Sequence, residues 1–168
     1  MPEFWNIYDR ERRDTGKLHP RGKPLPPDEY HIVVNAWLRN RNGDYLISRR
    51  SPQKTDALHW ESTGGSILAG ETSLQGAIRE VREELGIDID PACGRLICSG
   101  IRQYENCPDI LDVWLFDCDA PIESVMLQQE ETCDAKYASA QEIAEMYRAG
   151  EWIPLDKFNY LPMLGIDI

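Results

Sequence analysis

The sequence predicts an α/β fold in which a mixed β-sheet lies between helical layers. Short apolar stretches with strand character alternate with two amphipathic segments of helical period, at 73–85 and 140–150. The order of strands, helix, strands and helix favours a mixed sheet with helices against it. The 168 residues suit one domain with a substantial core. We therefore expect a single domain over residues 1–168.

The N-terminal part is predicted to form an extension followed by a β-hairpin. Residues 1–29 hold an aromatic stretch and then a polar run with prolines, so we expect a short strand or hairpin and a loop there. Residues 31–40 are nearly all apolar and predict a buried strand. Asn42 and Gly43 form a strong turn signal, and 45–50 is the predicted return strand.

A helix is predicted after a short strand at 60–62 and a glycine-containing loop. Its apolar residues recur at helical spacing: Leu74, Ala77, Ile78, Val81 and Leu85. Thr72 and Gln75 fit a capping box, with Thr72 as the N-cap. Gly86 stands where a left-handed residue would end the helix. The segment from 73 to 85 is therefore expected to be one amphipathic helix.

Three glutamates of this helix, Glu80, Glu83 and Glu84, are spaced i, i+3 and i+4, which places them on one helix face. We expect that face to point away from the core. Like charges at this spacing repel one another by a few tenths of a kcal/mol per pair, so a cation is expected to pair with them. Arg79 is one candidate, and a bound divalent metal is the other.

The remaining elements follow the helix in order. Strands are expected at 96–103, 110–118 and around 132–137, and a second helix at 140–150 with Gly150 as its stop. The tail is expected to add a short helix near 155–161.

Composition bounds the function. The net charge of −11 argues against broad nucleic-acid binding, which needs a basic surface. No apolar stretch is long enough to span a membrane, and the first residues do not resemble a signal peptide, so we expect a cytoplasmic protein. The five cysteines are an odd number without a C-x-x-C pair, which favours reduced thiols.

A glycine loop followed by an acidic helix suits a site for a metal and a phosphate group. Gly64, Gly65 and Gly70 allow the backbone to approach a ligand closely, and carboxylates hold hard cations such as Mg²⁺. Basic residues lead into this loop: Arg49, Arg50 and Lys54. They can hold phosphate oxygens, although ordinary surface charges are an equal alternative for each.

The motif resembles the complete Nudix box: Gly65, five residues, Glu71, seven residues, then REVREELGI from Arg79 to Ile87. This resemblance implies a Nudix-type α/β/α sandwich and a hydrolase that uses Mg²⁺ or Mn²⁺ to cleave a diphosphate linkage. The implied metal ligands are the three box glutamates and the Gly65 carbonyl, and Gly64 is implied to contact substrate. Arg79 would orient a glutamate, and Glu71 would pair with Arg79 or act through water.

The general base is left open between a box glutamate and a residue of a later loop. Glu130 and Glu131 lie in a suitable loop, and exposed loop acids are the alternative for both. The implied substrate is a small molecule, a nucleoside diphosphate derivative or a related organic pyrophosphate. A homodimer that uses the N-terminal segment is a further hypothesis.

Outside the box, residues 5–90 are similar to the branch of the family related to isopentenyl-diphosphate isomerase. The similar pieces are IYDRE, RG at 21–22, EYHIVVNAWLRN, LISRRSPQK and WESTGGSILAGE. By this likeness, His31 stands at the position where the isomerases carry a metal-binding histidine. Lys54 stands at the position where they carry a basic residue that faces the diphosphate. However, residues 61–66 contain neither the cysteine nor the histidine of the isomerases, so we expect His31 to be a strand-end residue. An isomerase-like enzyme and a non-catalytic nucleotide-binding sensor remain the alternatives to a hydrolase.

Overall fold

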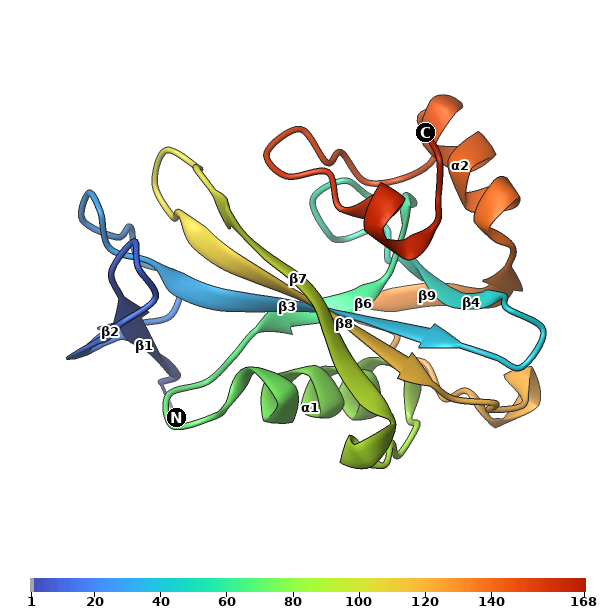
Figure 1. Cartoon of the computed structure of the whole chain (residues 1–168), viewed down its shortest axis with the longest axis horizontal. Coiled ribbons are helices and arrows are strands. Elements are labelled where there is room, and N and C mark those ends of the chain that lie inside the picture. The colour runs from blue at the N-terminus through green and yellow to red at the C-terminus, as the bar shows by residue number, and fades with distance from the viewer. Residues whose placement is uncertain (1) are drawn as a thin grey trace.

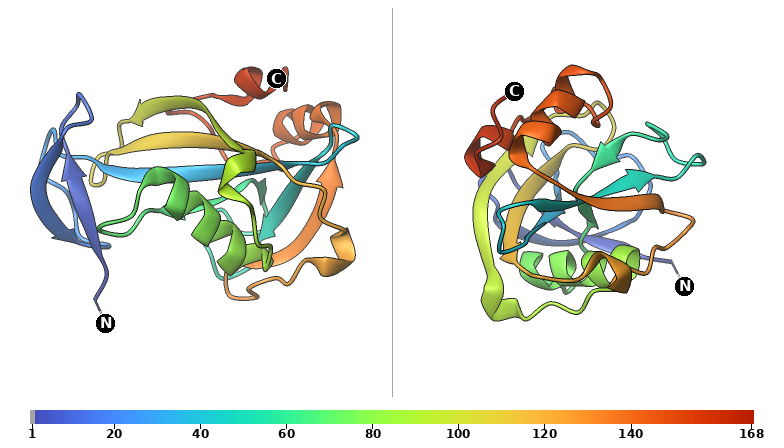
Figure 2. Two further views of the ribbon diagram at one scale, coloured as in Figure 1. Left: turned by 60° about the horizontal axis from the view of Figure 1, so that its bottom comes forward. Right: turned by 90° about the vertical axis from the view of Figure 1, so that its right-hand side faces the viewer.

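A computed structural model describes residues 2–168 and shows a mixed sheet between two helical layers (Figure 1). Helix α1 (Ser73–Leu85) covers one face of the sheet, and α2 (Ala140–Arg148) with the C-terminal segment covers the other. An N-terminal hairpin stands at one end of the sheet, as the left view of Figure 2 shows. The predicted α/β/α sandwich is therefore confirmed.

The large sheet has seven strands, with the order β5-β4-β3-β8-β7 and with β6 and β9 paired to β3 and β4. Only β3 and β8 are parallel to each other; the other pairs are antiparallel. The bounds of these strands are β3 His31–Arg39, β4 Tyr45–Arg50, β5 Trp60–Glu61, β6 Thr63–Ser66, β7 Gly94–Arg102, β8 Asp109–Asp117 and β9 Thr132–Ala138. The hairpin consists of β1 (Phe4–Tyr8) and β2 (Asp14–Pro20), which form a separate two-stranded sheet.

Strand β3 is apolar along most of its length because both of its faces are covered. Val34, Ala36 and Leu38 belong to the core cluster under α1, whereas Trp37 belongs to the cluster under α2 and the tail. One edge of β3 pairs with β8 along its full length. The other edge pairs first with β6 and then with β4. This central position of β3 brings the glycines of β6 onto the middle of the sheet.

The helix signals agree with the observed ends. Thr72 and Gln75 form the capping box of α1, and Gly86 ends the helix with a φ of 68°. The tail is different from the expectation: its short helix is a 3₁₀ turn at Leu161–Leu164, not a segment at 155–161. The buried Leu155 and Tyr160 fill the core under α2 from irregular backbone, and the turn ends at Gly165 with a φ of 75°.

The N-terminal hairpin is held in place by an ion pair with a buried aspartate. Arg12 in the hairpin turn donates two hydrogen bonds of 2.5 Å to Asp112 of β8, whose side chain is fully buried. Ser73 at the start of α1 also donates to Asp112. Loss of one partner of a buried charge pair leaves the other charge uncompensated, so this pair ties the hairpin to the main sheet.

All five cysteines are free thiols, as the sequence predicts, and two of them, Cys93 and Cys133, are exposed. Within residues 2–168 no helix is both long and apolar enough to cross a membrane.

Candidate active site

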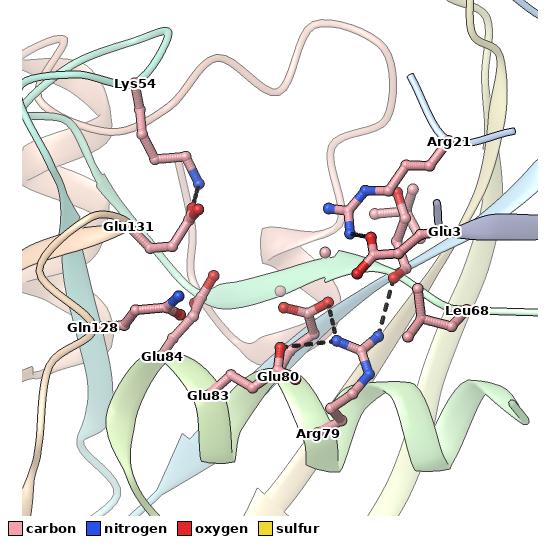
Figure 3. A pocket seen from close by; sticks show the side chains of 14 residues that line it. Glu3, Arg21, Lys54, Leu68, Arg79, Glu80, Glu83, Glu84, Gln128 and Glu131 are labelled. Atoms are coloured by element: carbon pink, nitrogen blue, oxygen red, sulfur yellow. Dashed lines mark hydrogen bonds and ion pairs between the residues drawn. The ribbon is translucent and has the colours of Figure 1, made fainter. Parts of the chain in front are cut away.

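A polar cavity of about 370 Å³ lies where α1, β6, the N-terminal hairpin and the loop before β9 meet (Figure 3). Apart from Val33 and Leu68, its lining consists of glycines and polar or charged residues. These residues are Glu3, Arg21, Lys54, Gly64, Gly65, Ser66, Arg79, Glu80, Glu83, Glu84, Gln128 and Glu131. The cavity therefore collects most of the residues that the sequence predicts for the site.

Arg79 is the centre of an ion-pair network on the floor of this cavity. Its Nε and Nη2 atoms donate to the two carboxylate oxygens of Glu71, at 2.7 and 3.0 Å. Its Nη1 atom donates to Glu80 at 2.9 Å and to Glu83 at 3.0 Å. Arg79 is thus the cation for two of the three box glutamates, and the pairing of Glu71 with Arg79 is the one the resemblance implies.

Glu71 also stabilises the glycine loop directly. Its carboxylate accepts a hydrogen bond of 2.8 Å from the Leu68 backbone N–H. Burial alone would raise the pKa of Glu71, but the hydrogen bonds from Arg79 and from Leu68 hold this pKa below its usual value. Glu71 is therefore an ionised residue that positions Arg79, and through it the box glutamates.

The expectation that the box glutamates point away from the core is wrong for two of them. Glu80 and Glu84 are buried, with 7% and 6% of their surface exposed, whereas Glu83 lies at the open side with 51% of its side chain exposed. The reason is that β6 covers this helix face closely. A Cβ atom on Gly65 would lie 2.5 Å from Glu80 Oε1, so a larger residue there would force the Glu80 carboxylate to move.

The buried carboxylates interact unfavourably with one another. Burial raises the pKa of Glu84 well above its usual value, and the nearby charges of Glu61 and Glu80 raise it further. Burial also raises the pKa of Glu80 in spite of its ion pair with Arg79. Several acidic groups are therefore held in a low-dielectric cavity that would be stabilised by an additional cation.

This donor set fits a hard divalent cation in kind, because carboxylate and backbone oxygens are the ligands that Mg²⁺ prefers. However, the carboxylates are not arranged as a complete set of metal ligands. Across residues 2–168 no group of three or more His, Cys, Asp or Glu side chains is already arranged as a metal site. Arg79 holds Glu80 and Glu83, while Glu84 points toward the side of the cavity lined by Gln128 and Glu131 (Figure 3).

Of the basic residues predicted to bind substrate, only Lys54 lines the cavity. Arg49 donates to the Leu58 carbonyl at 2.9 Å, and its guanidinium carbon lies 5.8 Å from the centre of the Trp60 ring. Arg50 pairs with Glu61 at 2.7 Å, because β4 and β5 are neighbours. The structure therefore does not bring Arg49 or Arg50 to the cavity, although Arg50 supports Glu61 behind it.

The two candidate loop bases are placed differently. Glu131 lines the cavity and its carboxylate pairs with Lys54. Glu130 is exposed, and it contributes its backbone carbonyl to a hydrogen bond from Ser51. Only Glu131 is therefore positioned to reach a ligand in the cavity.

Sequence reasoning missed six residues of the lining: Glu3, Arg21, Val33, Ser66, Leu68 and Gln128. Arg21 and Glu3 form an ion pair of 2.5 Å at the side of the cavity opposite Lys54 (Figure 3). The RG dipeptide at 21–22, shared with the isomerase-related branch, was the only local signal for Arg21. No pattern in the sequence pointed to Glu3 or Gln128.

His31 lies outside the cavity, at the start of β3, as expected for a strand-end residue. Its ring stacks on Trp5 with the ring centres 3.9 Å apart, and its Nδ1 atom is 3.8 Å from Cys107 Sγ. Burial lowers the pKa of His31 to about 4.

This histidine predicts a pH dependence of stability. Between about pH 4 and 6.5 the unfolded chain binds a proton at His31 and the folded chain does not, so acid favours unfolding. We expect the free energy of unfolding of the wild type to fall by about 3 kcal/mol through this group as the pH falls through that interval. Urea unfolding at pH 7 and pH 4.5 should show a smaller loss for His31→Gln than for the wild type. Equal losses would contradict the burial of a neutral imidazole.

The fold and the cavity together define a class of enzyme, an α/β/α sandwich whose glycine loop and acidic helix line one polar cavity. The NUDIX domain model matches residues 29–160, so the chain belongs to the Nudix family. It is a Nudix hydrolase and acts on pyrophosphate bonds. The matched range begins after the N-terminal hairpin.

Individual relatives agree with this assignment. The chain is 38% identical over 161 residues to an uncharacterized Nudix hydrolase of Listeria monocytogenes, covering 95% of this chain and 93% of that protein. It is 34% identical over 83 residues to the CTP pyrophosphohydrolase of Escherichia coli, with 49% and 60% of the chains covered. The likeness to the isomerase branch is also found: an isopentenyl-diphosphate Δ-isomerase of Salmonella heidelberg is 29% identical over 85 residues, with 49% and 47% covered.

Among solved structures, the chain resembles the crystal structure of DR0079 from Deinococcus radiodurans. The TM-score is 0.74 at 23% identity, and the match covers 97% of this chain and 98% of the other. This likeness shows the fold.

Proposed function

We propose that the protein is a divalent-metal-dependent hydrolase, with Mg²⁺ or Mn²⁺, that cleaves the diphosphate linkage of a nucleoside diphosphate derivative or a related organic pyrophosphate. The observation that carries this proposal is the burial of Glu80 and Glu84 against the glycine loop, beside an Arg79 that already holds Glu71 and Glu83. Such a group of carboxylates is costly in a protein without a cation, and the raised pKa of Glu84 reflects that cost.

The bound metal would polarise the phosphoryl oxygens and lower the pKa of its bound water. Glu80, Glu83, Glu84 and the Gly65 carbonyl would hold it. The side chains of the protein would orient the metal ligands and bind the phosphate groups. Arg79, fixed by Glu71, holds Glu80 and Glu83 in orientation, and Lys54 offers a positive charge to the phosphate oxygens.

The candidate general base is Glu131. In the structure its carboxylate accepts from Lys54, so it becomes free to accept a proton when Lys54 turns toward the phosphate oxygens of a substrate. This exchange would couple phosphate binding to activation of the base. Glu84, whose pKa is raised by burial, is the alternative among the box glutamates.

The lining of the cavity supports recognition of the diphosphate rather than of the group attached to it, because its side chains are mostly charged. One relative is named for CTP and another for isopentenyl diphosphate, and these two compounds carry very different groups on their phosphates. The substrate class therefore has to be determined by assay.

The test is release of phosphate from nucleoside di- and triphosphates, dinucleotides, nucleotide sugars and prenyl diphosphates. Each reaction is run with Mg²⁺, with Mn²⁺ and with chelator, and with added phosphatase to reveal products that remain esterified. We expect metal-dependent release from one class of compound. Binding of a panel member without release of phosphate from any of them would contradict the proposal.

The same panel separates the two alternatives. An isomerase would convert isopentenyl diphosphate to dimethylallyl diphosphate without releasing phosphate, and residues 61–66 offer no cysteine for that reaction. A sensor would bind a nucleotide and leave it intact. Neither alternative is favoured by a specific contact in the cavity.

A cytoplasmic location and a homodimer built on the N-terminal hairpin remain predictions. The hairpin exposes two large apolar side chains, Phe4 at 37% and Leu18 at 62%, which a second copy could cover. Light scattering is expected to give twice the mass of the chain, and a monomeric mass would contradict the dimer.

A further inference from the structure

The N-terminal hairpin brings a cation of its own to the cavity, in addition to Lys54 and Arg79. Arg21, directly after β2, extends over the carboxylates from the side opposite Lys54 (Figure 3). Each of these two cations is neutralised by a carboxylate from its own neighbourhood: Lys54 by Glu131 and Arg21 by Glu3. The cavity thus has a positive group on each side, and each is occupied by an internal anion.

The position of Arg21 is fixed by backbone contacts. Its N–H donates to the Glu3 carbonyl at 3.0 Å, which extends the pairing of β1 and β2. The hairpin in turn is attached to the glycine loop, since the Ala69 N–H donates to Phe4 O at 2.8 Å and the Gly70 N–H donates to Asn6 Oδ1 at 2.9 Å. The backbone at Arg21 is therefore connected to the glycine loop through the hairpin.

The Arg21–Glu3 ion pair itself is exposed and weak. About half of each side chain is accessible, 45% for Arg21 and 48% for Glu3, so solvent screens the attraction. A diphosphate carries at least two negative charges where a carboxylate carries one, and its oxygens match the planar guanidinium fork. An incoming phosphate is thus a stronger partner for Arg21 than Glu3 is.

We propose that Arg21 is a substrate-binding residue that grips a phosphate group of the substrate, and that Glu3 is its internal counter-ion, which the substrate displaces. The inference rests on the proposed function, because it assumes a diphosphate in this cavity. It assigns the N-terminal hairpin a role in the site, outside the matched range of 29–160. Lys54 and Arg21 would then hold the diphosphate from its two sides.

The test compares two substitutions, each of which removes one charge of the ion pair. If the pair were only structural, both substitutions would change KM in the same direction. Arg21→Gln is expected to raise KM about tenfold or more, because a charge-assisted hydrogen bond to phosphate is lost. Glu3→Gln is expected to lower KM about two- to fivefold, because the competing carboxylate is gone. In the Arg21→Gln background, Glu3→Gln should have no effect on KM. Arg13→Gln, on the same hairpin and paired with Asp9, is the matched control and should leave KM unchanged.

A binding measurement keeps this inference separate from the proposed hydrolysis. Calorimetric titration with methylenediphosphonate and Mg²⁺ should show the same opposite shifts in Kd, even if no panel compound is hydrolysed. If both substitutions weaken binding, the ion pair only holds the hairpin and the inference is overturned. Unchanged binding for Arg21→Gln, or no binding to the wild type at millimolar concentration, would overturn it as well. If Arg21→Gln has a clearly lowered melting temperature, the Kd of Glu3→Gln alone decides the question: tighter binding supports the inference, and unchanged or weaker binding overturns it.

Discussion

Glu84→Gln is expected to reduce kcat/KM at least ~100-fold, or about 3 kcal/mol of transition-state stabilisation, while the fold is kept. Glutamine has nearly the same shape but no charge, so it removes the carboxylate from the buried side of the cavity without removing its packing. Glu84 is the box glutamate that Arg79 does not hold, and it lies beside Glu61 and Glu80. Its charge is therefore available for a metal ion.

The stability of this variant gives an independent readout. Burial and neighbouring acids raise the pKa of Glu84, so its ionised form is disfavoured in the metal-free protein. For a carboxyl group whose folded pKa is raised, stability is lost as the pH rises through that pKa. At pH 8, metal-free Glu84→Gln should therefore have the same melting temperature as the wild type or a higher one. Addition of Mg²⁺ should raise the melting temperature of Glu84→Gln less than that of the wild type. Glu123→Gln, on the exposed surface, is the control. Nearly full activity of Glu84→Gln would contradict the assignment of the site.

Leu85→Ala is expected to lower the free energy of unfolding by ~2–5 kcal/mol. Leu85 is fully buried at the end of α1, in the cluster between this helix and the sheet. Its carbonyl also accepts from the Met126 N–H at 2.8 Å, so the end of the helix organises the loop that leads to Glu131.

Urea unfolding is the measurement for Leu85→Ala, with the midpoint compared at an unchanged slope. Arg82→Ala on the same helix is the matched control, because 72% of the Arg82 side chain is exposed and its loss should change stability by about 0.5 kcal/mol or less. An unchanged midpoint for Leu85→Ala would contradict the buried face of α1.

The helices and strands could be predicted because their signals are local. The capping box of Thr72, the left-handed Gly86 and the apolar stripe between them describe α1 to the residue. The Asn42–Gly43 turn and the apolar run at 31–40 likewise identify β3 and β4. The box spacing also identified Arg79, Glu80, Glu83 and Glu84, which do meet in one cavity.

The environment of each site residue could not be predicted in the same way. The helical period correctly grouped Glu80, Glu83 and Glu84, but it could not show that the tertiary structure would bury Glu80 and Glu84. Arg49 and Arg50 precede the glycine loop in sequence, yet the pairing of β4 with β5 directs them to Leu58 and Glu61.

The amino-acid sequence alone therefore determined the family, the order of the elements and the chemical nature of the site, because spacing along a helix or a loop specifies these directly. Tertiary structure decided which carboxylates are buried and which cations reach them. Arg21 is the clearest case: it is 59 residues from Glu80 in the chain and reaches the cavity through the docking of a hairpin. That docking depends on contacts with the glycine loop and on an ion pair with a buried aspartate of β8, and no local pattern encodes contacts between such distant segments.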